Sequence, residues 1–149
     1  MLNILVSACL LGIDCRYDGK NCYNEKVLEL RKYANLIPIC PEQMGGLTTP
    51  RVPAEIVGQN LINKEGNDVT VNYQKGASIA LKIAKINDCK YALLKQKSPS
   101  CGCGLIYDGS FTGKVIEGDG NTTKLLKENG ITCYSDEEID ELINLFKNN

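Results

Sequence analysis

The segment Asn3-Ile4-Leu5-Val6-Ser7-Ala8-Cys9 decides the fold of this chain. Residues 3–7 form a short apolar run that ends in small residues, which is typical of a fully buried strand in a parallel sheet. Cys9 lies just past the carboxyl end of this strand. The same arrangement, a buried strand followed by a cysteine, recurs twice along the chain.

Residues 36–39, Leu-Ile-Pro-Ile, read as a second short strand and are followed directly by Cys40. Residues 91–95, Tyr-Ala-Leu-Leu-Lys, read as a third strand that runs into a loop containing Cys101. The carboxyl ends of parallel strands meet at one edge of a sheet, where ligands of such folds bind. We therefore expect Cys9, Cys40 and Cys101 to converge there.

The segments between these strands have the apolar periodicity of helices. The clearest helix spans Tyr73–Ile86, and Ser135 with Glu138 forms a capping box for the last helix. Two apolar runs within residues 56–71, around a turn at 63–67, indicate a hairpin. The remaining expected elements are a helix at 24–33 ended by Asn35, a glycine-rich stretch at 105–120, a helix at 122–128 and a strand at 131–134.

Alternation of strands and helices implies right-handed crossovers and a mostly parallel sheet with helices on both faces. We predict a single-domain α/β fold of the Rossmann-like three-layer kind, with a small hairpin insertion. At 149 residues the chain is about one domain long, so we expect residues 1–149 to form that one domain.

The composition excludes several classes of protein. With 43% hydrophobic and 23% charged residues, the chain is neither disordered nor fibrous. A net charge of −1 offers no electrostatic footprint for a polyanion, so duplex nucleic acid is excluded as the main ligand. No apolar run approaches the roughly 20 residues that span a bilayer. We expect a cytoplasmic protein without a membrane partner.

The chain has eight cysteines and no histidine. Histidine-based triads, histidine-ligated zinc and the usual base at neutral pH are therefore all excluded. The opening residues lack the basic region of an export signal, so we expect reduced thiols rather than a secreted disulfide framework. Cys89 and Cys133 read as small buried hydrophobic residues. Cys15 and Cys22 fall in loops, and Cys15 is placed to line the site.

Three converging thiolates are costly to bury unless a cation neutralises their charge. Structural zinc sites mostly use close pairs of the C-x2-C type, and this chain has none. A [4Fe-4S] cluster accepts widely separated cysteines, and with three ligands it keeps one iron open as a Lewis acid. The residues alone leave three interpretations open, namely a cluster, a structural zinc site and inert thiols.

Six blocks of sequence stand out along the chain. They are SACLLG at 7–12, CRYDG at 15–19, CPE at 40–42 with GGL at 45–47, PRVPAE at 50–55, SPSCG at 98–102 and IYDGSF at 106–111. In their order and their content these blocks resemble the thiouracil desulfidase family, long catalogued as a domain of unknown function. The resemblance spans nearly the whole chain.

The resemblance implies a [4Fe-4S] cluster held by Cys9, Cys40 and Cys101, with a fourth iron that binds the sulfur of the substrate. It also implies catalytic roles for Glu42 and Ser98. Glu42 would take a proton from the attacking water, for which we expect it to be partly buried. On residue type alone, Glu42 also suits a solvated loop and Ser98 a turn before proline.

Two more residues complete the expected site. Ser100 is assigned to substrate contact and is an alternative to Ser98 as the catalytic serine. Arg51, between prolines on a stiff loop, is placed to contact a pyrimidine oxygen or to balance the charge of the cluster, although a surface arginine fits the sequence nearly as well.

The implied activity is the non-redox desulfuration of a thiolated nucleobase of the thiouracil type to the oxo base and sulfide. A different class of protein stays open beside it, a module that carries iron or sulfur for a partner and exposes its cluster to a docking surface. A zinc-stabilised structural domain is the third. The sequence leaves the oligomeric state and the physiological thio-substrate open.

Overall fold

A computed structural model describes residues 1–148 as a four-stranded parallel sheet with the strand order β2-β1-β5-β8, flanked by helices and two small hairpins. The strands of the sheet and the helices follow one another in this order: β1 (Leu2–Ser7), the 3-10 helix η1 (Ala8–Leu11), α1 (Glu25–Glu29), η2 (Leu30–Lys32), β2 (Ala34–Ile39), α2 (Pro41–Met44), α3 (Thr70–Ile86), β5 (Tyr91–Leu94), α4 (Asn121–Glu128), β8 (Thr132–Ser135), η3 (Asp136–Glu138) and α5 (Ile139–Lys147). The hairpins are β3 (Ala54–Val57) with β4 (Asn60–Asn63), and β6 (Cys103–Tyr107) with β7 (Val115–Asp119). The predicted α/β fold class is confirmed.

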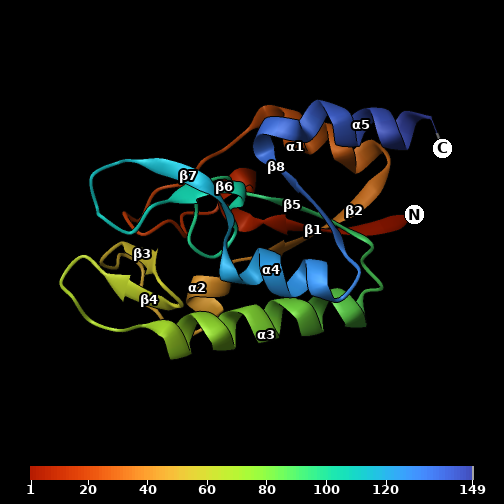
Figure 1. The fold of residues 1–149 in the computed structure, drawn as a ribbon. Helices are drawn as coiled ribbons and strands as arrows, with labels where there is room; N and C mark the ends of the chain where they lie inside the picture. The colour runs from red at the N-terminus through yellow and green to blue at the C-terminus, as the bar shows by residue number, and fades with distance from the viewer. Residues whose placement is uncertain (149) are drawn as a thin grey trace.

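The sheet is the middle of three layers, with α1 and α5 on one face and α3 and α4 on the other (Figure 1). Successive residues of a strand point to opposite faces. Ile4 and Val6 accordingly pack in the cluster formed with α1 and α5, whereas Leu5 packs in the cluster formed with α3 and α4. Both faces of β1 are therefore buried, which explains its unbroken apolar run.

Helix ends follow the side chains that the sequence offers. The Asn24 side chain accepts a hydrogen bond from the backbone N–H of Lys26 and begins α1. Ser135 and Glu138 form the predicted capping box before α5, whose buried stripe is Ile139, Leu142, Ile143 and Phe146. Of the helices formed by residues 1–148, none combines the length and the apolar character needed to cross a bilayer.

Three local details differ from the sequence predictions. The strand β2 begins at Ala34, so Asn35 lies inside it and does not simply end the preceding helix. The predicted turn at 63–67 is present and is flanked by an antiparallel bridge between Ile62 and Asp68, but the hairpin β3–β4 turns earlier, between Val57 and Asn60, where Gly58 supplies the positive φ of 64° that a tight turn requires. The glycine-rich stretch at 105–120 holds most of a second hairpin, β6–β7, which was not predicted.

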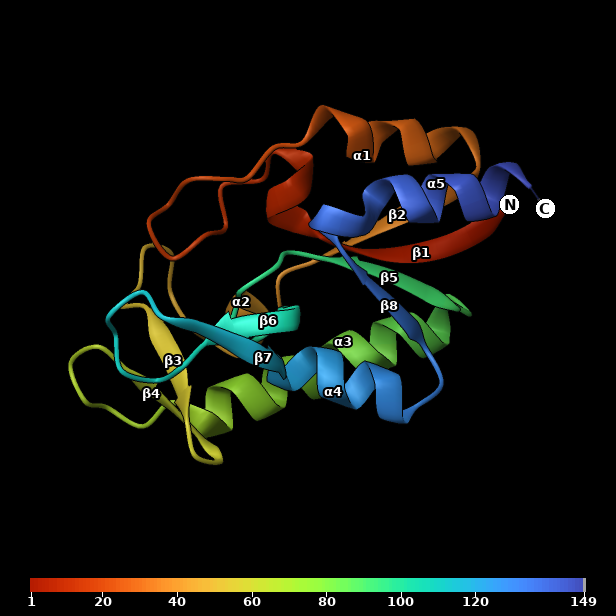
Figure 2. The same cartoon turned by 45° about the horizontal axis from the view of Figure 1, so that its top comes forward.

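Both hairpins lie at the carboxyl ends of the parallel strands, as Figures 1 and 2 show. The short helix α2, which follows β2 at the same edge, packs closely on α3. A Cβ on Gly76 would overlap the carbonyl oxygen of Pro41, and a Cβ on Gly45 would overlap that of Asn72. Two glycines thus allow the backbones of α2 and α3 to touch, which brings the start of α3 beside the residues that follow β2.

Candidate functional site

A cavity of about 510 Å³ lies at the carboxyl edge of the sheet. Its lining comes from the ends of β1, β2 and β5, from the loop before β3 and from both hairpins. Six of the seven predicted site residues line it: Cys9, Cys40, Glu42, Arg51, Ser98 and Cys101. Residues that are up to 92 positions apart in the sequence therefore share one site because parallel strands end at one edge.

The three predicted cysteine ligands follow three different strands. Cys9 and Cys101 are buried, with 8% and 5% of their surface exposed, and Cys40 is partly buried. Burial raises the pKa of Cys101 to about 12, and a hydrogen bond with Cys15 together with burial raises the pKa of Cys40 even further. These thiols hold their protons until a metal displaces them, since metal ligation requires the thiolate.

The donor set fits an iron–sulfur cluster better than a single ion. Within residues 1–148, no three or more histidine, cysteine, aspartate or glutamate side chains surround one point closely enough for one metal ion. A cubane binds its cysteine ligands on separate irons, so these ligands stand further apart than those of one zinc. Three buried or partly buried cysteines around one cavity suit that requirement.

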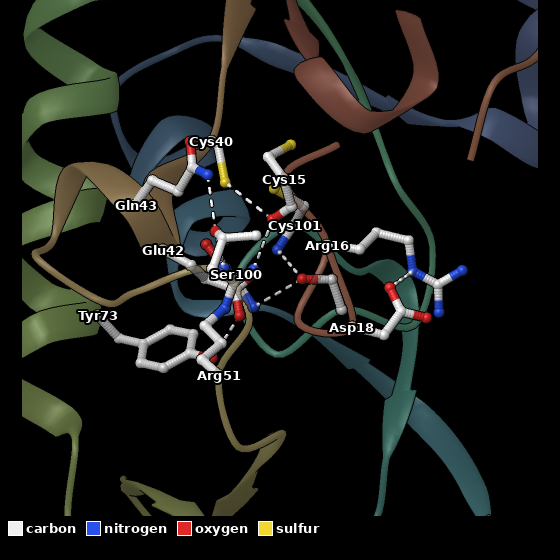
Figure 3. Close-up of polar contacts among 12 residues, drawn as sticks. Cys15, Arg16, Asp18, Cys40, Glu42, Gln43, Arg51, Tyr73, Ser100 and Cys101 are labelled. Carbon is white, nitrogen blue, oxygen red and sulfur yellow. Dashed lines mark hydrogen bonds and ion pairs between the residues drawn. The ribbon is translucent and has the colours of Figure 1, made fainter. Parts of the chain in front are cut away.

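Glu42 lies between two donors that hold its carboxylate (Figure 3). The hydroxyl of Tyr73 donates a hydrogen bond to Glu42 Oε2 at 2.5 Å, and Arg51 Nη2 lies 3.2 Å from Glu42 Oε1. Burial and the neighbouring carboxylate raise the pKa of Tyr73 well above its ordinary value, so the phenol stays protonated and donates. The Glu42 side chain is 18% exposed, which confirms the expectation of partial burial.

Arg51 is not a surface residue, since only 6% of its side chain is exposed. Its Nη2 also donates to the carbonyl oxygen of Cys15 at 2.8 Å, and its Nη1 donates to Thr49 Oγ1 at 3.1 Å. Its Nε is buried without a hydrogen-bond partner among the described residues. The guanidinium therefore links the loop before β3, the segment after β1 and Glu42 into one rigid unit.

Ser98 shapes the turn that presents Cys101. Its Oγ accepts hydrogen bonds from the backbone N–H groups of Ser100, at 3.1 Å, and Cys101, at 3.0 Å. Gly102 closes the turn by donating its N–H to the Ser98 carbonyl oxygen at 2.8 Å. The hydroxyl proton of Ser98 is not used by these bonds, because the oxygen only accepts in them. Ser98 lines the cavity, so this proton is available for donation to a group bound there.

The structure does not place Ser100 where it could contact a substrate, in contrast to the prediction. It is fully buried, and its hydroxyl forms a 2.7 Å hydrogen bond with Thr122 Oγ1, so it lies beneath the lining of the cavity. The backbone N–H groups of Thr122 and Thr123 both point at the Ser100 carbonyl oxygen. Ser100 therefore anchors the loop on the start of α4, and Ser98 is the serine that faces the cavity.

Tyr73 is a site residue that the sequence did not reveal. It was assigned only to the start of a helix, 31 positions from Glu42. The one signal in the sequence is Gly76 inside a helical pattern, because an interior glycine often marks a close approach of two backbones.

Four cysteines lie apart from the cavity. Cys89 is buried in the cluster under α3 and α4, and Cys133 packs against the same cluster, as predicted. The thiol of Cys103 donates to the carbonyl oxygen of Cys133 at 3.5 Å. Cys22 accepts from Arg16 Nη1 at 3.3 Å in the segment before α1. Cys15, by contrast, lines the cavity with the three predicted ligands.

The fold and the site together define a class of protein: an α/β protein in which strand-end cysteines and an ion-paired carboxylate share one cavity at the carboxyl edge of a parallel sheet. The family model described as 2-thiouracil desulfurase matches residues 4–138. The chain belongs to this family, which confirms the resemblance seen in its sequence.

Two known proteins are similar to this chain over nearly its full length. The "Uncharacterized protein YbbK" of Bacillus subtilis (strain 168) is 41% identical over 150 residues, which cover 94% of this chain and 99% of that protein. The solved structure of "[4Fe-4S]-dependent thiouracil desulfidase TudS" matches with a TM-score of 0.93 at 40% identity and covers 99% of both chains.

Proposed function

We propose that residues 1–149 form a single [4Fe-4S]-dependent desulfidase domain that converts a thiolated nucleobase of the thiouracil type to the oxo base and sulfide. One observation carries the proposal: Cys9, Cys40 and Cys101 line the same cavity as the paired carboxylate of Glu42. Membership of the 2-thiouracil desulfurase family and the likeness to a structure named as [4Fe-4S]-dependent support it.

Cys9, Cys40 and Cys101 are the residues that would hold the cluster. When bound, the cluster would supply one iron that none of these three cysteines binds, and that iron would act as a Lewis acid for the substrate sulfur. Lys97 also lines the cavity and forms no ion pair within residues 1–148, so one positive charge is available there, whereas Arg51 and Lys95 pair with Glu42 and Asp136. An oxygen-sensitive centre is expected from this chemistry.

Glu42 acts as the general base. A carboxylate has about four acceptor positions, and Tyr73 and Arg51 occupy one each. The remaining positions can accept a hydrogen bond from a water and then its proton. Attack of that water on the C–S carbon forms a C–O bond, the C–S bond breaks, and the sulfur leaves as sulfide with its electron pair. The sum is C=S plus water giving C=O plus hydrogen sulfide, with no net electron transfer.

Ser98 and Arg51 orient the base and the substrate. The Ser98 hydroxyl proton can be donated to a nucleobase atom, and Arg51 holds Glu42 in place through Nη2. The cavity volume of about 510 Å³ falls in the range of about 300–1,000 Å³ typical of small-molecule sites. Recognition of a single nucleobase needs neither a nucleic-acid surface nor a membrane.

The alternative of a carrier module is less well supported. A carrier would present its cluster to a docking surface, whereas Cys9 and Cys101 are buried.

All eight cysteines are free in the structure, which supports the proposal that the protein works in the reducing cytoplasm.

The proposal is tested by anaerobic purification, with iron and acid-labile sulfide analysis and an assay of uracil release from 4-thiouracil. We expect iron and sulfide in equal amounts, and a loss of most of both in Cys9→Ser, Cys40→Ser and Cys101→Ser, because an alkoxide is a harder ligand than a thiolate. Cys89→Ser, remote from the cavity, is the matched control and should keep its cluster. Zinc without acid-labile sulfide would contradict the proposal.

A further inference from the structure

Cys15 is a fourth thiol at the site, and nothing in the proposed reaction uses it. Only 3% of its surface is exposed, and it lines the cavity together with Cys9, Cys40 and Cys101. Cys15 and Cys9 belong to the same buried cluster, and Cys40 packs against it. Four of the eight cysteines thus face one cavity, one more than the proposed ligand set contains.

The backbone of Cys15 is held in place from both sides. Its carbonyl oxygen accepts hydrogen bonds from Arg51 Nη2 at 2.8 Å and from the Cys40 thiol at 3.7 Å (Figure 3). Its N–H donates to the carbonyl oxygen of Ile13 at 2.8 Å. A small side chain on a fixed backbone changes position by rotation between staggered rotamers. The Cys15 sulfur can therefore change its position without movement of the chain.

We infer that Cys15 is an exchangeable fourth ligand: its thiolate binds the iron that Cys9, Cys40 and Cys101 leave open, and the sulfur of the substrate displaces it. The inference rests on the proposed function. A thiolate is a soft ligand of the same kind as the substrate sulfur, so one can replace the other at iron without electron transfer. The displaced thiolate takes up a proton, and a lone thiol of this kind is uncharged at neutral pH.

A fourth thiolate adds one negative charge to the cavity, and the lining residues can compensate it. Arg51 already pairs with Glu42 and Lys95 with Asp136, whereas Lys97 lines the same cavity and forms no ion pair within residues 1–148. In the absence of substrate such a ligand shields the open iron from water and oxidants. A cluster iron without a protein ligand is the one that oxidation removes.

The test compares the wild-type holoenzyme with Cys15→Ala and with the control Cys22→Ala, all purified anaerobically. Cys22 lies in the same segment but does not line the cavity, and its sulfur accepts a hydrogen bond from Arg16 Nη1. After mild oxidation with ferricyanide and without substrate, we expect Cys15→Ala to convert a several-fold larger share of its cluster to the [3Fe-4S] form, measured by EPR, than the wild type or the control. We also expect a several-fold lower KM for 4-thiouracil, because no ligand has to be displaced.

Equal conversion in Cys15→Ala and the wild type would overturn the inference, and so would complete loss of the cluster in Cys15→Ala. Mössbauer spectra of the ⁵⁷Fe-loaded wild type need no variant. Four sulfur-ligated irons in the absence of substrate would support the inference, and one oxygen-ligated iron would overturn it. The absence of acid-labile sulfide from the wild type would instead overturn the proposed function itself.

Discussion

Replacement of Glu42 by glutamine separates catalysis from cluster assembly. Glutamine keeps the size of the side chain and removes the base. With the general base gone, we expect the rate of uracil release from 4-thiouracil to fall by about 100-fold to 10,000-fold. That loss corresponds to about 2.7–5.4 kcal/mol of transition-state stabilisation. None of the proposed cluster ligands is altered, so the iron and sulfide contents should match those of the wild type.

The structure adds a cost in stability that the sequence did not suggest. Glu42 accepts from Tyr73 and pairs with Arg51, and a glutamine oxygen can serve only one of these donors while its amide group opposes the other. The loss of one charge-assisted hydrogen bond costs about 1.5–3 kcal/mol. For a domain of this size each kcal/mol lowers Tm by about 2–4 °C, so we expect a decrease of about 3–12 °C. Activity is therefore measured well below that Tm.

Glu55→Gln is the matched control for this variant. Glu55 lines the same cavity, but its Oε1 accepts only from the backbone N–H groups of Gly109 and Phe111, at 2.9 and 3.2 Å. A glutamine oxygen can accept both bonds, so activity and Tm should stay near the wild-type values. A wild-type rate in Glu42→Gln would refute the role of Glu42 as base. An equal loss of activity in Glu55→Gln would show that the cavity needs negative charge rather than this base.

Two further predictions concern the residues that position Glu42. Tyr73→Phe removes one hydrogen-bond donor from the Glu42 carboxylate. A lost hydrogen bond to a charged group costs about 1.5–3 kcal/mol, and each 1.4 kcal/mol or so changes a rate about tenfold, so kcat should fall by about 10-fold to 100-fold. An unchanged kcat in Tyr73→Phe would count against a positioning role. Gly76→Ala should force α2 and α3 apart by overlap with Pro41 and destabilise the fold by about 1–3 kcal/mol, measured by urea denaturation. Full stability in Gly76→Ala would contradict the close backbone contact.

Local chemistry made much of the fold predictable. Short apolar runs identified β1 and β5, and the capping box before α5 followed from Ser135 and Glu138. The second hairpin was missed because β6 and β7 carry exposed and glycine-rich positions without a clear apolar alternation. Its pairing is visible only once the hairpin packs at the edge of the sheet.

The features of the site that depend on the order of the strands were predicted from the sequence, and those that depend on side-chain packing were not. Cys9, Cys40 and Cys101 meet because parallel strands end at one edge, a rule that the order of elements already contains. Ser98 and Ser100 are two residues apart, and only the direction of their side chains decides that one faces the cavity and the other faces Thr122.

The sequence by itself determined the fold class, the exclusion of histidine chemistry and the set of strand-end cysteines, because these follow from composition, periodicity and the order of the elements along the chain. Only the tertiary structure decided that Tyr73 and Arg51 hold Glu42 and that Ser100 lies beneath the lining of the cavity. These contacts come from close packing of α2 on α3 and from the path of one loop. Packing contacts between distant segments leave little trace in the spacing of residues, since many side chains of similar character could occupy the same positions.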